Sequence, residues 1–137
     1  MIIVSGCLAG LKCRYDGERK PSLKVVDLVK DGKAIPICPE QLGGLSTPRS
    51  PAEQQGKKVF TKDGIDLTLE FEKGANEVLM IAKLVGCKKA ILKSKSPSCG
   101  SCLIYDGTFT RTLIKGDGVL AKLLKENDIE VLTEDEI

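Results

Sequence analysis

Cysteine and serine side chains gather in one short stretch of this chain, KSKSPSCGSC at residues 93–102. Cys99 and Cys102 have the C-x-x-C spacing there, and Ser96 and Ser98 flank a proline. Thiolates are nucleophiles and ligands for soft metals, whereas serine hydroxyls in turns bond to the backbone or pass protons. The chain has six cysteines but no histidine. Cys/His zinc sites and Cys–His nucleophile pairs are therefore excluded, and any proton transfer falls to other side chains.

Four short, continuously apolar runs predict the strands that position these side chains, at residues 2–5, 34–38, 89–93 and 129–132. Apolar residues at three- and four-residue spacing predict helices between them, at 23–29, 69–85 and 119–124. Such alternation is typical of a parallel sheet with helices on both faces. We expect an α/β fold: a single-domain, three-layer sandwich of residues 1–137 with a mainly parallel four-stranded sheet, Rossmann or flavodoxin-like. Residues 57–66, with Asp63-Gly64 between two apolar segments, predict a small extra hairpin.

Three cysteines fall at the carboxyl ends of predicted strands. Cys7 follows the first strand, Cys38 ends the second, and Cys99 follows the third. Because the carboxyl ends of parallel strands meet at one edge of a sheet, we expect these thiols to converge there. Cys13, six residues beyond Cys7, can reach the same place, whereas Cys87 beside a helix-ending glycine is expected to be a small core residue.

Four kinds of thiol chemistry fit this pattern. Cys99 and Cys102 could form a thioredoxin-like dithiol, although that motif opens a helix and here lies in an irregular loop. Four cysteines could bind zinc, yet the paired spacing of such sites occurs only once. A lone nucleophilic cysteine would lack a histidine base. An iron-sulfur cluster held by distant loops needs only convergence of the thiols.

Polar residues follow the same strands. Glu40 lies two residues after Cys38, so it is either a general base beside a metal centre or a solvated surface residue. Arg49, in the proline- and glycine-rich loop of residues 37–51, could hold a phosphate, a planar carbonyl or an acidic neighbour. Ser96 is a candidate proton relay or water holder, or else a turn residue.

Composition limits the function classes. The 42% hydrophobic and 29% charged residues are typical of a globular protein. No apolar run approaches the length of a membrane span, and the first residues lack the charged leader of a signal peptide, so we expect a cytoplasmic protein without a membrane partner. A net charge of +2 is too small to indicate a nucleic-acid partner.

Four motifs together identify a family resemblance that extends over most of the chain. They are SGCLAGLKCRYDG, CPEQLGGLSTPRSPAE, DGIDLTLEFEKGA and LKSKSPSCGSCLIYDGTF. In this order they closely resemble the thiouracil desulfurase family. The resemblance implies an enzyme with a 4Fe-4S cluster bound by three cysteines, which removes sulfur from thiolated uracil without redox chemistry.

The resemblance also assigns roles to residues. For the cluster ligands we choose Cys7, Cys38 and Cys99 because each lies at a strand end, with Cys13 as the alternative to Cys7. The family's catalytic carboxylate falls on Glu40, which would deprotonate water while the open iron binds the substrate sulfur. The family's serine falls on Ser96, with Ser98 as its competitor.

The substrate implied is a small thiolated pyrimidine, converted to uracil and hydrosulfide. We place Ser98, Arg49 and Asp16 among the substrate-binding residues. Two other functions stay open: desulfuration or sulfur transfer on thiolated nucleosides or RNA, and a cysteine-rich metal-binding module without catalysis.

Overall fold

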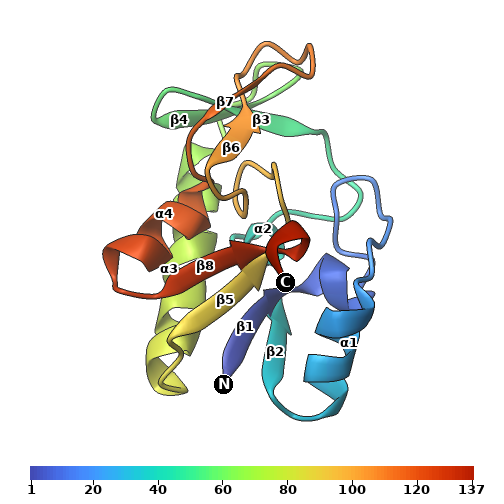
Figure 1. The fold of residues 1–137 in the computed structure, drawn as a ribbon. Coiled ribbons are helices and arrows are strands. Elements are labelled where there is room, and N and C mark those ends of the chain that lie inside the picture. Colours follow the sequence, from blue (N-terminus) through green and yellow to red (C-terminus); the bar gives the residue numbers. More distant parts are fainter.

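A four-stranded parallel sheet forms the centre of the protein (Figure 1). The structure, a computed structural model, describes all residues 1–137. The strands are β1 (Ile2–Ser5), β2 (Ala34–Ile37), β5 (Lys89–Leu92) and β8 (Glu130–Thr133). Their order is β2-β1-β5-β8, and every pairing is parallel. This is the order of the first four strands of a flavodoxin-like sheet, so the predicted fold class is confirmed.

Helices cover both faces of the sheet, as predicted. Helix α1 (Leu23–Lys30) lies on one face, and α3 (Thr68–Leu84) and α4 (Val119–Glu126) lie on the other. Successive residues of β1 point to opposite faces, so Ile3 packs in the core beneath α3 and α4 while Val4 packs in the core beneath α1. None of the helices is both long and apolar enough to cross a lipid bilayer.

A short helix, α2 (Pro39–Leu42), directly follows β2 and packs against α3. Two glycines allow the backbones of α2 and α3 to touch. A Cβ at Gly74 of α3 would lie 1.8 Å from the Pro39 carbonyl oxygen, and a Cβ at Gly43 would lie 2.0 Å from the Glu70 carbonyl oxygen. The position of α2 therefore depends on the absence of these two side chains.

Two small antiparallel hairpins lie beyond the carboxyl ends of the parallel strands (Figure 1). They consist of β3 (Ala52–Gln55) with β4 (Lys58–Thr61), and β6 (Leu103–Tyr105) with β7 (Leu113–Lys115). The first hairpin was predicted with the wrong turn. Its strands pair across Gln55 and Lys58, whereas the Asp63-Gly64 turn leads only to an isolated bridge between Phe60 and Asp66. The second hairpin was not predicted.

Candidate active site

A cavity of about 650 Å³ lies at the carboxyl edge of the sheet. Its walls come from the loops after β1, β2 and β5 and from the two hairpins. Seven of the sequence-predicted residues and the rival thiol line it: Cys7, Cys13, Cys38, Glu40, Arg49, Ser96, Ser98 and Cys99. The switch point of an open α/β sheet is where ligands bind, because the loops diverge there.

Three thiols reach this cavity from three different strand ends. Cys7 lies in the 3-10 turn η1 (Gly6–Ala9) directly after β1, Cys38 is the residue before α2, and Cys99 lies in the loop after β5. Cys7 and Cys99 are buried, and Cys38 is partly exposed. Cys13 is buried in the same cavity wall. Cys102 is exposed, and Cys87 belongs to the core on the α3 side.

Burial is the main influence on the pKa values of two of these thiols. It raises the pKa of Cys7 to about 11, against the opposing effect of the Arg14 and Lys93 cations. Burial also raises the pKa of Cys99 to about 12, against hydrogen bonding from the hydroxyls of Ser5 and Ser98. Thiols of this kind stay protonated at neutral pH until a metal displaces the proton.

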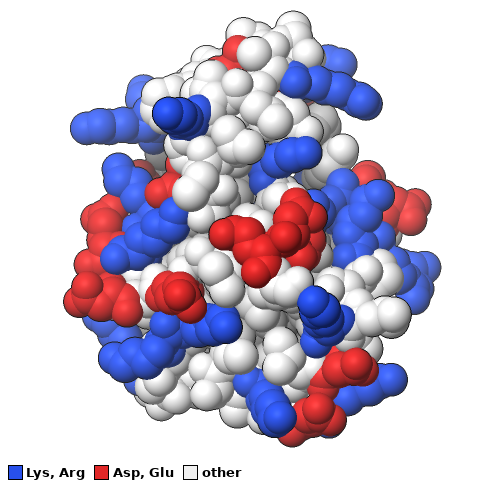
Figure 2. All heavy atoms as spheres, viewed as in Figure 1, with Lys and Arg blue, Asp and Glu red and all other residues white.

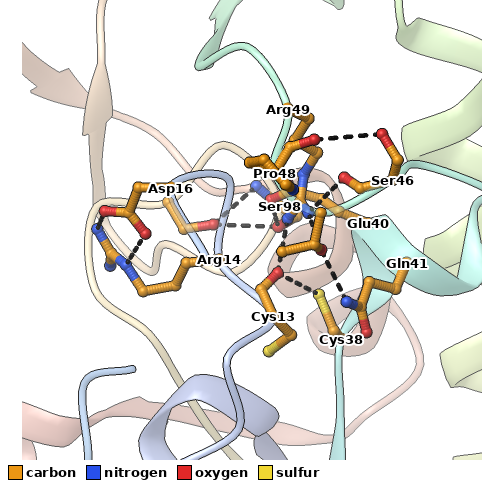
Figure 3. A network of polar contacts seen from close by, with 12 residues as sticks. Cys13, Arg14, Asp16, Cys38, Glu40, Gln41, Ser46, Pro48, Arg49 and Ser98 are labelled. Carbon is orange, nitrogen blue, oxygen red and sulfur yellow. Dashed lines mark hydrogen bonds and ion pairs between the residues drawn. The ribbon is translucent and has the colours of Figure 1, made fainter. Parts of the chain in front are cut away.

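Cys38 behaves differently because Cys13 lies beside it. Interaction with the Cys13 thiol lowers the pKa of Cys38 against the effect of burial, and the same interaction, together with burial, raises the pKa of Cys13. The Cys38 sulfur also lies 3.6 Å from the Cys13 carbonyl oxygen (Figure 3). Cys38 is therefore the thiol most easily ionised in the cavity.

A carboxylate with both oxygens bound lies next to these thiols. Ser98 Oγ donates to Glu40 Oε2 at 2.8 Å, and Arg49 Nε donates to Glu40 Oε1 at 3.1 Å (Figure 3). The side chains of Arg49 and Glu40 are only 8% and 15% exposed. Glu40 is thus held in one orientation at the cavity wall, with Ser98 between it and the Cys99 sulfur, 3.7 Å from the Ser98 hydroxyl.

The two serines of this loop have different surroundings. Ser96 Oγ accepts the N–H groups of Ser98 at 3.2 Å and Cys99 at 3.1 Å, so it stabilises the turn. Its oxygen lies 3.0 Å from Ser98 Oγ and makes no hydrogen bond to the Glu40 carboxylate. Ser98, whose hydroxyl donates to Glu40 directly, therefore lies closer to this carboxylate than Ser96, the first choice from sequence.

Helix α4 fixes the loop that carries these serines. The N–H groups of Val119 and Leu120, at its first turn, donate to the carbonyl oxygens of Pro97 and Ser98 at 3.0 and 2.8 Å. The loop thus satisfies donors that a helix start leaves free. Gly118 allows this contact, because a Cβ there would lie 2.4 Å from the Ser98 carbonyl group.

Arg49 and Asp16, both predicted to bind substrate, have partners within the protein. The remaining nitrogens of Arg49 donate to Ser46 O, Thr47 Oγ1 and Cys13 O at 3.0, 2.8 and 2.9 Å. Arg49 therefore ties α2 to the Cys13 loop and holds Glu40. Asp16 is not among the residues that line the cavity. Its carboxylate pairs with Arg14 at 3.3 Å and accepts the N–H of Glu18 at 3.0 Å.

Glu134, near the C-terminus, binds two residues of the cavity wall. No motif or spacing in the sequence indicated that it belongs to the site. Its carboxylate binds Lys93 Nζ at 2.7 Å and the Ser94 N–H at 2.7 Å, at the point where β5 enters the Cys99 loop. Burial raises the pKa of Glu134, but its bonds to Lys93 and Ser94 outweigh burial and hold that pKa below its ordinary value. Figure 2 shows acidic side chains gathered at the middle of this face, where η2 (Glu134–Glu136) lies in Figure 1.

Comparison with known proteins gives consistent matches over the whole chain. The family model of 2-thiouracil desulfurase matches residues 2–136. The chain is 45% identical over 147 residues to the uncharacterised protein YbbK of Bacillus subtilis (strain 168), covering 100% of this chain and 97% of the relative. It is also 45% identical to the solved structure of the [4Fe-4S]-dependent thiouracil desulfidase TudS, with a TM-score of 0.95 over 99% of this chain and 91% of that one.

Proposed function

The chain belongs to the 2-thiouracil desulfurase family, and from this premise we propose that it removes sulfur from thiolated uracil with a 4Fe-4S cluster. The observation that carries the proposal is the juxtaposition of a fixed carboxylate and several thiols in one cavity. We assign the cluster ligands to Cys7, Cys38 and Cys99, and the base to Glu40. The reaction adds water to the thiocarbonyl carbon and gives uracil and hydrosulfide, without change of oxidation state.

The thiols fit a cluster better than a single metal ion. They line one cavity from separate loops, and no three Cys, Asp or Glu side chains are close enough to hold one ion. A cluster spaces its thiolate ligands apart, one on each iron. Cys7 directly follows β1 at the sheet edge where Cys38 and Cys99 also lie, whereas Cys13 lies six residues further along the loop. This favours Cys7 over Cys13 as the third ligand.

When bound by three thiolates, a 4Fe-4S cluster supplies one iron without a protein ligand, which acts as a Lewis acid toward a soft thiocarbonyl sulfur. The chain's own residues supply the proton transfer. Glu40 accepts a proton from the attacking water, and Arg49 keeps the carboxylate oriented toward the cavity. The Ser98 hydroxyl, 2.8 Å from Glu40, can hold that water or pass its proton onward. We therefore assign the serine role to Ser98, with Ser96 behind it.

Anaerobic purification followed by iron and sulfide analysis tests this function. We expect about four irons per chain and loss of thiouracil absorbance on incubation, with uracil and sulfide formed in equal amounts. Single Ser replacements of Cys7, Cys38 or Cys99 should each remove the cluster. A protein with full cluster content and no activity on any thiolated pyrimidine would instead be a metal-binding module.

Thiolated nucleotides are a second candidate substrate class, favoured by the charge of the cavity. Seven basic side chains line it, against the carboxylates of Glu40 and Glu53. Four of them have no ion-pair partner: Lys20, Lys62, Lys95 and Arg111. Such cations favour a phosphate group. A higher kcat/KM for thiouridine monophosphate than for thiouracil, lost at high salt, would select this class.

A further inference from the structure

The few aromatic side chains of this protein are concentrated at the active-site cavity. The chain has five in all, three Phe and two Tyr, and Tyr15, Tyr105 and Phe109 line the cavity. Tyr105 and Phe109 both belong to the β6–β7 hairpin, Tyr105 at the end of β6 and Phe109 in its tip. Planar aromatic side chains at a cavity wall are the usual surface on which a pyrimidine ring stacks.

We propose that the tip of the β6–β7 hairpin is the stacking wall for the pyrimidine ring, with Phe109 as the substrate-binding residue and Glu53 as the residue that positions it. This inference deepens the proposed function, on which it rests. It explains what a hairpin of two three-residue strands contributes to an active site whose thiols and carboxylate all come from other loops.

The backbone of the tip is strained in a way that serves the position of Phe109. Phe109 has φ 59° and Arg111 has φ 62°, left-handed values that L-residues adopt at an energetic cost. Glycine would adopt them freely, so Phe109 is a poor choice for the backbone alone. Strained residues of this kind are concentrated at ligand sites, where the surroundings hold them in place.

The Glu53 carboxylate and Gly107 hold the tip of the β6–β7 hairpin in this conformation. Glu53 Oε1, on β3, accepts the N–H groups of Gly107 at 3.0 Å and Phe109 at 3.1 Å. Gly107 has φ 94°, and a Cβ there would lie 2.6 Å from the Gln54 carbonyl oxygen, so the tip presses directly on β3. Gln55 Nε2 adds a bond to the Gly107 carbonyl oxygen at 3.0 Å.

The same strand ties the tip to the serine loop. Gln54 Nε2 donates to the carbonyl oxygens of Pro97 and Asp117, both at 2.9 Å. Through β3, the aromatic wall is held at a fixed distance from Ser98 and Glu40. A ring stacked on Phe109 would therefore present its edge to the thiols and the carboxylate in one orientation.

Binding of uracil and of 5,6-dihydrouracil to the anaerobically purified protein tests this proposal by calorimetry. The two probes share their amide groups, but the ring of dihydrouracil is puckered and stacks poorly. The wild-type protein should bind uracil about tenfold more tightly. Phe109→Leu should remove most of this preference, whereas Phe60→Leu, an aromatic outside the cavity, should leave it unchanged.

Substitutions at Glu53 and Phe109 distinguish an effect on the position of the Phe109 ring from an effect on the stability of the fold. Glu53→Ala should reduce the same preference, and Glu53→Gln, whose amide oxygen can still accept both N–H groups, should restore most of it. Phe109→Gly should remove the preference while its melting temperature stays at or near the wild-type value, because relief of the backbone strain offsets the lost packing. This variant keeps the test decisive if Phe109→Leu fails to fold.

The outcomes separate this proposal from the proposed function. If the protein removes sulfur from thiouracil but Phe109→Leu keeps the wild-type ratio of uracil to dihydrouracil affinity, the stacking wall is wrong and the desulfurase stands. A large fall in the melting temperature of Phe109→Gly would likewise make Phe109 a packing residue only. Absence of both desulfuration and uracil binding in the wild type would overturn both proposals.

Discussion

Replacing Gly74 with Ala adds one methyl group where α3 touches α2. Helix propensity alone predicts that this change, inside a helix of 17 residues, stabilises the protein by about 1 kcal/mol. The packing predicts the opposite sign. The new Cβ would lie 1.8 Å from the Pro39 carbonyl oxygen, whereas real Cβ atoms essentially never approach below 3.0 Å. Helix α2 must therefore move away by roughly 1.2 Å, the difference between these distances.

The steric effect outweighs the propensity gain. Overpacking costs about 1–3 kcal/mol, and a clash of this size with a backbone atom belongs at the upper end of that range, so after the propensity gain we expect a net loss in the free energy of unfolding of about 2 kcal/mol. Glu40 follows Pro39 and moves with it, which lengthens its 2.8 Å bond to Ser98 beyond hydrogen-bonding range. Because a misplacement of about 1 Å can reduce turnover a hundredfold, we expect the desulfuration rate to fall by about tenfold to a hundredfold.

Urea denaturation measures the first effect, and the loss of thiouracil absorbance measures the second. Asn76→Ala is the matched control, because Asn76 is exposed two residues along the same helix. Its free energy of unfolding should stay within about 0.5 kcal/mol of the wild type, with full turnover. A Gly74→Ala protein that is more stable than the wild type and equally active would refute the reasoning that this contact positions α2.

Three further experiments test the site. Cys13→Ser should retain iron and sulfide while Cys7→Ser loses them, because Cys7 directly follows β1 at the sheet edge whereas Cys13 lies further along the loop; the reverse result would exchange their roles. Glu134→Gln should reduce the free energy of unfolding by about 1–3 kcal/mol at pH 7. Since the pKa of Glu134 is lowered on folding, that difference should shrink as pH falls below about 4.5, and a difference constant down to pH 3 would contradict the assignment. Arg49→Lys keeps the charge but loses the fork of donors, so kcat should fall about tenfold with little change in KM. An unchanged kcat would mean that Arg49 does not hold Glu40.

The sheet and the gathering of the thiols could be predicted because both depend on local patterns. Continuous apolar runs mark buried parallel strands, and the carboxyl ends of such strands share one edge. Cys7, Cys38 and Cys99 each follow a run of this kind, so their common location required no knowledge of the loops. Glu40 is close to Cys38 in sequence and therefore shares its location.

Features that depend on the path of the chain could not be predicted. From the sequence alone, Gly74 is a residue of low helix propensity inside a helix. Its packing role becomes visible only when the backbone of α2 is placed against it. Ser96 and Ser98 are equivalent in sequence, and only the turn decides which hydroxyl faces Glu40. The tip that carries Phe109 is held by side chains of a strand more than fifty residues earlier, which no local pattern reveals.

The desulfuration rate of a Glu40→Gln protein with full iron and sulfide content tests the central claim most directly. The amide is nearly isosteric with the carboxylate and leaves the thiols untouched, so fold and cluster content should be unchanged. It cannot accept a proton from water, so the rate of thiouracil loss should fall by about a hundredfold or more. An undiminished rate at full cluster content would contradict the assignment of Glu40 as the base and, with it, the mechanism proposed for this cavity.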